Sequence, residues 1–246
     1  MTSESSVRLS VIVPAYNEEL RLPDTLRHVL DYLSAQTFRS EVLVVDDGST
    51  DGTAQVVRDI AHKGGILRLC VHPDGANHGK GAAVRLGMSR AVGEFRLFMD
   101  ADNSTTIDQV ESFWPAFEEG FDTVIGSRKA LGAQVAVHQP WYKEFAGRAG
   151  NILIRLLVAP GISDTQAGFK MFTRRSAETV FPRLTIERWG YDFEILAIAR
   201  EHGLRVCEVP IRWVNSPDTK VRLGSYLQVL AEVWRVRRNL KAGRYR

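Results

Sequence analysis

The sequence predicts an α/β fold in which a mostly parallel sheet is covered by helices on both faces. Two observations support this prediction. Short runs rich in β-branched residues alternate with segments of helical periodicity through the first half of the chain, and repeated strand–helix units are typical of parallel sheets. Two of the strands also end in acidic turns, Asp46-Asp47 and Asp100-Ala101-Asp102, and ligands bind at the carboxyl ends of such strands.

The first half of the chain contains five strand-like runs and the helices that connect them. Pro14 is expected to end the first strand. Ser49, Thr50 or Asp51 can cap the helix that follows the second strand. The predicted strands are 9–13, 41–45, 66–71, 94–99 and 122–126, and the other predicted helices are 23–35, 81–91 and 107–119.

After Arg128 the strand–helix alternation becomes less regular. Residues 141–158 are predicted to form a helix that is apolar nearly all round. Such a helix is either buried in the core or lies at an interface. A further helix at 189–200 and a strand at 205–213 follow.

The last segment, 216–246, is strongly basic. It has eight basic and two acidic residues and therefore a net charge of +6. Since the whole chain has a net charge of +3, the remaining residues carry −3. An apolar stripe from Leu223 to Trp234 lies beside a cluster of arginines. This pattern fits a helix packed on the body of the protein or a helix lying on a membrane surface. We therefore divide the chain into a main domain, 1–215, and a basic amphipathic helix, 216–246.

Composition excludes several classes of protein. The two cysteines, Cys70 and Cys207, lie in apolar strand-like runs, which disfavours a disulfide scaffold or zinc site and suits a reducing compartment. The first residues are polar and predict no signal peptide. No apolar run approaches the roughly 18 residues of a membrane span, so we expect a soluble chain. An acidic body without a nucleic-acid-binding motif argues against a nucleic-acid partner.

Common phosphate-binding loops do not match. No G-x-G-x-x-G follows the first strand, which disfavours a dinucleotide site. His78-Gly79-Lys80-Gly81 is similar to part of a P-loop, but Asp74 stands where the first glycine is needed. Gly81 replaces the Ser or Thr that would bind magnesium.

Asp100 and Asp102 are better candidates for a metal site. Residues i and i+2 of an extended segment point to the same side, so the two carboxylates can converge on one cation. Oxygen ligands suit Mg²⁺ or Mn²⁺, which also bind substrate phosphates. The alternative is a helix cap or a solvated acidic loop.

Three motifs occur in order, each after a strand: Pro-Ala-Tyr-Asn-Glu at 14–18, Val-Asp-Asp-Gly-Ser-Thr-Asp-Gly-Thr at 45–53, and Asp-Ala-Asp at 100–102. Together they resemble family 2 glycosyltransferases with the GT-A fold, a Rossmann-like architecture. Further segments are similar to the branch that glycosylates dolichyl or polyprenyl phosphate, and within it to dolichyl-phosphate glucosyltransferases. These segments are 79–83, 125–128, 164–172 and 188–194.

The resemblance implies roles for the donor-side residues. The implied nucleotide-binding residues are Pro14, Tyr16, Glu18, Asp46, Asp47, Lys80 and Asp100. Asp46 or Asp47 would accept a hydrogen bond from the base, and Lys80 would lie near the diphosphate. Asp100 and Asp102 would hold Mg²⁺ or Mn²⁺ against that diphosphate. Related mannose enzymes have a Gln two positions after this motif, where Ser104 stands here.

On the acceptor side, the resemblance implies positive charge that binds a lipid phosphate. The candidates are Arg128, Lys143 and Arg148, with Gln166 beside them. Asp164 would orient the acceptor near the sugar. Without the surrounding motif, Arg128 and Arg148 would be read as surface ion pairs. The implied catalytic residues are Asp102, Arg128 and Asp164. Asp192 and Glu194 either cap and solvate their helix or belong to the site.

We therefore expect an inverting, metal-dependent transferase at the cytoplasmic face of a membrane, bound peripherally. It would move a sugar, glucose first, from a nucleotide sugar to dolichyl or polyprenyl phosphate and supply a donor for glycan assembly. This substrate favours the membrane-surface role of 216–246, and a membrane-protein partner could provide further anchoring. The alternatives are another donor (UDP-N-acetylhexosamine, UDP-galactose or GDP-mannose), a glycan acceptor, or a nucleotide-sugar-binding scaffold without turnover.

Overall fold

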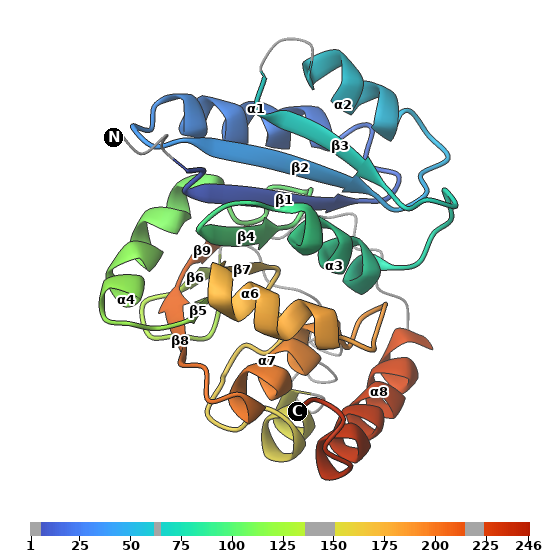
Figure 1. Ribbon diagram of the computed structural model, residues 1–246, viewed down its shortest axis with the longest axis vertical. Coiled ribbons are helices and arrows are strands. Elements are labelled where there is room, and N and C mark those ends of the chain that lie inside the picture. Colours follow the sequence, from blue (N-terminus) through green and yellow to red (C-terminus); the bar gives the residue numbers. More distant parts are fainter. Residues whose placement is uncertain (1–5, 62–64, 136–150, 215–223) are drawn as a thin grey trace.

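The structure is a computed structural model that describes residues 6–61, 65–135, 151–214 and 224–246. Its centre is a seven-stranded sheet in the order β3-β2-β1-β4-β7-β5-β8 (Figure 1). Within the described ranges only β7 runs antiparallel to its neighbours. The strands are β1 Leu9–Ala15, β2 Ser40–Asp46, β3 Leu67–Val71, β4 Phe95–Met99, β5 Thr123–Ser127, β7 Phe169–Thr173 and β8 Val206–Pro210.

Helices cover both faces of this sheet, which confirms the predicted class (Figure 1). Alternate residues of the strands point to opposite faces, so Ile12 and Phe98 pack with one helical layer and Val11 and Leu97 with the other. The first layer contains α3 Lys80–Arg90, α6 Arg174–Val180 and α7 Tyr191–Glu201, and the second contains α1 Leu22–Ser34, α2 Thr53–Ala61 and the 3₁₀ helix η1 Ile107–Phe113.

The order of the strands reverses next to β1. The chain runs from β1 through β2 to β3 on one side and then returns to place β4 on the other side of β1. In open α/β sheets the loops diverge at such a point and leave a crevice at the carboxyl ends of the strands. The two acidic turns follow β2 and β4 and therefore lie at this end of the sheet.

Two predicted elements differ from the structure, and two observed elements were not predicted. The helix expected at 107–119 consists of η1 followed by α4 Trp114–Glu118, since Pro115 has no N–H to continue the helix. The strand expected at 205–213 ends at Pro210, and β9 Arg212–Trp213 pairs instead with β6 Gln134–Val135 in a small second sheet. The antiparallel strand β7 and helix α6 were not predicted.

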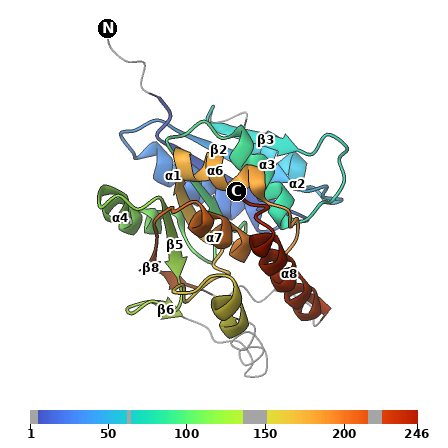
Figure 2. The same ribbon diagram turned by 60° about the horizontal axis from the view of Figure 1, so that its bottom comes forward.

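The helix predicted at 141–158 lies partly outside the described residues. Within the part that the structure describes, 151–157 are helical. Its apolar residues divide between two environments: Ile154 is 1% exposed, whereas Ile152 and Leu156 are 55% and 74% exposed. Figure 2 shows this segment next to the last helix, α8 Gly224–Lys241, and Arg237 donates a hydrogen bond to the Leu157 carbonyl.

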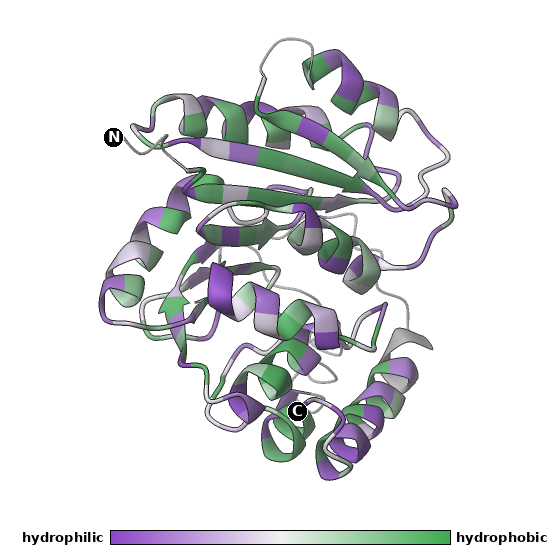
Figure 3. Cartoon of the chain, viewed as in Figure 1, coloured by the Kyte–Doolittle hydropathy of each residue, from purple (hydrophilic) through white to green (hydrophobic). Residues whose placement is uncertain are grey.

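Helix α8 mixes apolar and charged residues, in contrast to the strongly apolar strands (Figure 3). Val233 and Val236 are buried against the body, whereas Leu230 and Trp234 are exposed. The part of the predicted apolar stripe whose side chains the structure describes is therefore divided between packing and surface. The boundary at 215/216 falls outside the described residues. Among the helices that the structure describes, none is both long enough and apolar enough to cross a membrane.

Candidate active site

Two loops at the ends of β1 and β2 are hydrogen-bonded into one wall. The Asn17 backbone N–H donates to the Ser49 hydroxyl, and the Asn17 side chain accepts from the Thr50 N–H. The Glu18 N–H donates to Thr53, and the Glu18 carboxylate pairs with Arg21. Of the predicted base and ribose residues on this wall, Pro14 is buried within β1, Tyr16 is 40% exposed and Glu18 is 9% exposed.

Asp46 and Asp47 lie next to this wall and are both nearly buried. Asp46 accepts a hydrogen bond from the Ser49 N–H. The Asp47 carboxylate accepts three, from the Asn77 amide and the backbone N–H groups of His78 and Gly79, at 2.8–2.9 Å. Asp47 thereby fixes the loop that leads into α3. A contact between either carboxylate and a base stays a prediction.

Lys80 and Asp100 form an ion pair between α3 and the end of β4. Burial lowers the pKa of Lys80, but Asp100, Tyr191 and Asp192 together outweigh burial and hold that pKa well above its usual value, so Lys80 is cationic. Asp102 accepts a hydrogen bond from the Ser104 N–H at 3.0 Å. A Cβ atom on Gly168 would lie 2.1 Å from an Asp100 carboxylate oxygen, so this close approach requires glycine.

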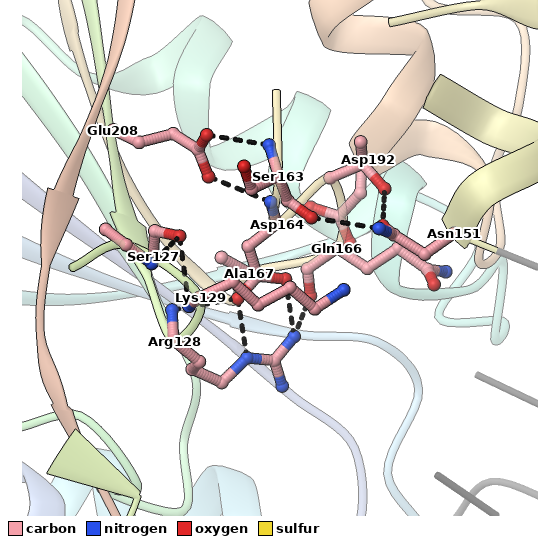
Figure 4. A network of polar contacts seen from close by, with 12 residues as sticks. Ser127, Arg128, Lys129, Asn151, Ser163, Asp164, Gln166, Ala167, Asp192 and Glu208 are labelled. Carbon is pink, nitrogen blue, oxygen red and sulfur yellow. Dashed lines mark hydrogen bonds and ion pairs between the residues drawn. The ribbon is translucent and has the colours of Figure 1, made fainter. Parts of the chain in front are cut away.

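Arg128 and Asp164 form the second polar centre (Figure 4). The Arg128 side chain donates to both Asp164 oxygens at 2.7 and 2.8 Å, and its backbone N–H adds a third bond at 3.0 Å. Asp164 is 1% exposed. Burial raises the pKa of Asp164, but the hydrogen bonds and charge of Arg128 outweigh burial and lower that pKa to about 2.

Residues that the sequence did not single out support this pair. The Glu208 carboxylate accepts from the backbone N–H groups of Ser163 and Asp164, at 2.7 and 2.8 Å (Figure 4). The Arg128 guanidinium lies 5.3 Å from the centre of the Trp213 ring. Glu208 and Trp213 lie on β8 and β9, far along the chain, so only the pairing of the strands reveals their proximity.

Positive charge gathers around Arg128. Burial lowers the pKa of the neighbouring Lys129, and the charges of Arg128 and Arg155 add to that lowering. Gln166 is exposed, and its backbone carbonyl accepts a long hydrogen bond from the Arg128 side chain, at 3.4 Å. Lys143 and Arg148 lie outside the described residues. Lys129 and Arg155 had no motif to identify them.

The segment 164–168 joins the two centres. Its first residue holds Arg128, and its last contacts Asp100. Burial lowers the pKa of Arg128, but Asp164 raises it, and the Asp100 charge adds to that rise. The Lys80–Asp100 pair, predicted for the donor side, and the Arg128–Asp164 pair, predicted for the acceptor side, are therefore connected by this five-residue segment.

Asp192 and Glu194 do not solvate their helix, because both are buried. Asp192 forms an ion pair with the fully buried Lys170 at 2.5 Å. Glu194 accepts hydrogen bonds from Thr185 and Ile186 and from the Tyr245 hydroxyl. Glu194 thus has a structural role, and Asp192 lies near enough to Lys80 for its charge to raise the pKa of that lysine.

Asp100 and Asp102 fit a magnesium or manganese ion by the chemistry of their donors. Both offer carboxylate oxygens, and Asp100 already holds the ammonium of Lys80, which shows that a cation is accommodated there. Among the described residues no group of three or more His, Cys, Asp or Glu side chains could hold a metal.

The profile of a family described as "Glycosyl transferase family 2" matches residues 10–181. Two similar curated proteins are the dolichyl-phosphate beta-glucosyltransferase of Mus musculus and dolichyl-phosphate beta-glucosyltransferase ALG5C of Trichomonas vaginalis, both 36% identical. The alignments cover 96% of this chain and 80% of the mouse protein, and 98% of this chain and 74% of the Trichomonas protein.

Two solved structures share the fold. Glucosyl-3-phosphoglycerate synthase from Mycobacterium tuberculosis, in complex with Mn²⁺, UDP-glucose and phosphoglyceric acid, gives a TM-score of 0.69 at 20% identity. The alignment covers 94% of this chain and 80% of the Mycobacterium chain. Mannosyl-3-phosphoglycerate synthase from Rubrobacter xylanophilus gives 0.67 at 19% identity and covers 97% and 76%. At these identities the similarity concerns the fold alone.

Proposed function

Since this chain belongs to glycosyl transferase family 2 and has the GT-A fold, we propose that it transfers glucose from UDP-glucose to dolichyl or polyprenyl phosphate. Support comes from the relatives named dolichyl-phosphate beta-glucosyltransferases, which are 30–36% identical over most of the chain. One structural observation carries the proposal further. The segment 164–168 holds a cationic centre at Arg128 within reach of the Lys80–Asp100 pair.

The donor half fits a nucleoside diphosphate. Asp100 and Asp102 would hold Mg²⁺ or Mn²⁺, which when bound offsets negative charge on the departing UDP. Lys80 adds a second positive charge on the same side. The wall that carries Tyr16 and Glu18, together with Asp46 next to it, would bind the base and ribose.

The acceptor half fits a phosphate monoester. The second pKa of such a phosphate is about 6, so much of it is a dianion at neutral pH. It therefore needs no strong general base, and positioning becomes the main requirement. Arg128 would place a phosphate oxygen in line with the anomeric carbon, with Asp164 and Trp213 fixing the guanidinium.

In this reaction the new bond between the phosphate oxygen and the anomeric carbon forms as the bond from that carbon to the UDP oxygen breaks. Attack from the face opposite UDP inverts the anomeric configuration and gives a β-linked glucosyl phosphate. Gln166, Lys143 and Arg148 complete the proposed acceptor contacts.

The proposed site of action is the cytoplasmic face of a membrane, where a lipid phosphate presents its head group. Leu230 and Trp234 on α8 and Ile152 and Leu156 beside them are exposed apolar side chains. Arg238 and Lys241 of α8 are exposed cations near them. An apolar surface next to cations binds an anionic bilayer interface.

The test incubates purified protein with Mg²⁺ or Mn²⁺, polyprenyl phosphate and one radiolabelled donor at a time: UDP-glucose, UDP-galactose, UDP-N-acetylglucosamine or GDP-mannose. We expect label in the lipid fraction with UDP-glucose. Transfer from another donor instead would correct the sugar. UDP binding with no label in lipid from any donor would contradict the transferase proposal.

A further inference from the structure

The Tyr191 hydroxyl is buried without a hydrogen bond. Tyr191 begins α7, is 0% exposed, and its hydroxyl oxygen has no hydrogen-bond partner among the residues that the structure describes. Its ring packs against Phe98, with ring centres 6.0 Å apart. Native proteins satisfy most buried polar atoms, so an exception of this kind calls for a physical reason.

Two ion pairs supply charged groups that act on this hydroxyl. Lys80 pairs with Asp100, and Lys170 pairs with Asp192. Burial raises the pKa of Tyr191 well above its usual value, and the charge of Asp192 adds to this, as does that of Asp100, whereas Lys80 opposes it through its charge and a side-chain contact with the hydroxyl. The hydroxyl is therefore neutral and lies near Lys80, Asp100 and Asp192.

Helix packing holds Tyr191 close to the residue beside Lys80. A Cβ atom added to Gly81 would lie only 2.8 Å from the Tyr191 Cβ and 2.8 Å from the Ile186 carbonyl oxygen. The Ala82 N–H also donates to the Glu187 carbonyl at 3.1 Å. The first turn of α3, which carries Lys80, is thus fixed against the start of α7.

Lys80 needs a second partner when the site is filled. In the free protein its ammonium binds the Asp100 carboxylate, the same group that would bind the metal ion. If Asp100 bound that ion, the ammonium would lose a hydrogen-bond acceptor. Asp192 is already engaged by Lys170, whereas the Tyr191 oxygen can accept.

We propose that Tyr191 is a positioning residue whose hydroxyl accepts a hydrogen bond from Lys80 when donor is bound, directing the ammonium toward the diphosphate. A neutral acceptor suits this task because it orients the ammonium without cancelling its charge, as a carboxylate would. This inference rests on the proposed function, since it assumes a nucleoside diphosphate beside Lys80.

The experiment measures UDP binding in the presence of Mg²⁺ by titration calorimetry, so it does not depend on transfer to lipid. The variants are Tyr191→Phe, Lys80→Met and the double variant. We expect Tyr191→Phe to raise the Kd for UDP roughly tenfold, the effect of losing a hydrogen bond to a charged group. In the Lys80→Met background the same change should alter Kd by less than about twofold, because interacting residues are non-additive.

A thermal unfolding scan distinguishes this role from a structural one. Removing an unpaired hydroxyl should leave the Tm of Tyr191→Phe at or above that of the unchanged protein. The matched control is Tyr32→Phe. Tyr32 lies on α1, away from the site, and this change removes its hydroxyl, which donates a hydrogen bond to Glu111. Its Kd for UDP should stay unchanged.

Three results would overturn the inference: an unchanged Kd in Tyr191→Phe, an equal effect in the Lys80→Met background, or a large fall in Tm. If the unchanged protein binds UDP but transfers no sugar to lipid, the proposed function fails while the binding cycle remains decisive for Tyr191. If it does not bind UDP, both fail.

Discussion

At the scale of single residues, the geometry of Arg128 leads to a test of acceptor binding. Its planar fork meets both Asp164 oxygens, an arrangement that a lysine cannot reproduce. We expect Arg128→Lys to lower kcat/KM for polyprenyl phosphate by roughly 10–100-fold, with the Kd for UDP unchanged. Steady-state assays with varied acceptor measure this effect.

The matched control is Arg68→Lys. Arg68 pairs with Glu41 near the start of β2, at the opposite end of the sheet. This variant should keep full activity. If Arg128→Lys weakens UDP binding and spares the acceptor, Arg128 is wrongly assigned.

The same pair predicts a dependence of stability on pH. The pKa of Asp164 falls from 3.8 to about 2 on folding, so its ionisation stabilises the fold above pH 4, and that stabilisation is lost as pH falls toward 2. The contribution is ~2 kcal/mol at neutral pH. About 1 kcal/mol of it should be lost between pH 5 and pH 3.

Urea unfolding at these two pH values measures this loss. In Asp164→Asn the fall in unfolding free energy should be smaller than in the unchanged protein by about that 1 kcal/mol. Equal slopes in the two proteins would show that Asp164 is not ionised at a lowered pKa in the folded state.

Motifs predicted the individual residues of this site better than their contacts. Lys80, Asp100, Arg128 and Asp164 each belong to a short motif that a sequence displays. Their supporting contacts come from distant segments, as with Glu208, whose carboxylate binds the backbone at 163 and 164. Side-chain periodicity is local information and does not show such contacts.

At the scale of elements, β7 illustrates the same limit. Phe169 and Met171 pack in the helical layer of α1 and α2, and Phe172 packs in the layer of α3 and α7. The buried Lys170 lies between Phe169 and Met171 in the sequence. A lysine in the middle of a short apolar run disguises a strand, because charged residues are rarely buried unless paired. Its partner, Asp192, lies on α7.

Helix α8 carries a prediction about membranes. Changing both Leu230 and Trp234 to Ser removes exposed apolar surface and leaves the buried Val233 and Val236 in place. We expect binding to anionic vesicles to weaken about tenfold or more while the Tm changes little. Vesicle co-sedimentation measures the binding.

Val92→Ser is the control for α8, because Val92 is 52% exposed but precedes β4, at the end of the sheet away from the site. Its vesicle binding should be unchanged. Undiminished binding of the Leu230→Ser/Trp234→Ser double variant would exclude α8 as the membrane-binding surface.

At the scale of the whole molecule, the alternation of strands and helices was enough to predict a layered α/β fold. The parallel strands β1, β2, β4 and β5 were placed correctly because each is a short apolar run before a polar turn, although Pro14 does not end β1, which continues to Ala15. The order of the sheet was not predictable in the same way. It inserts β7 between β4 and β5, which brings 164–168 against Asp100 and so joins the two halves of the site.

Because both halves of the site belong to one sheet, donor binding should stabilise the whole fold. UDP with Mg²⁺ at about 100 times Kd adds about 2.7 kcal/mol to the unfolding free energy. For a chain of this size that should raise the Tm by roughly 5–10 °C. Differential scanning calorimetry measures the shift.

Two comparisons make this thermal shift specific. Chelation of the metal, or the variants Asp100→Asn and Asp102→Asn, should abolish most of the shift, because these carboxylates supply the protein ligands proposed for the ion. GDP at the same concentration should give a much smaller shift, since the proposed donor is a uridine nucleotide. An equal shift with GDP would refute that base preference, and a full shift after chelation would show that donor binding does not require the metal.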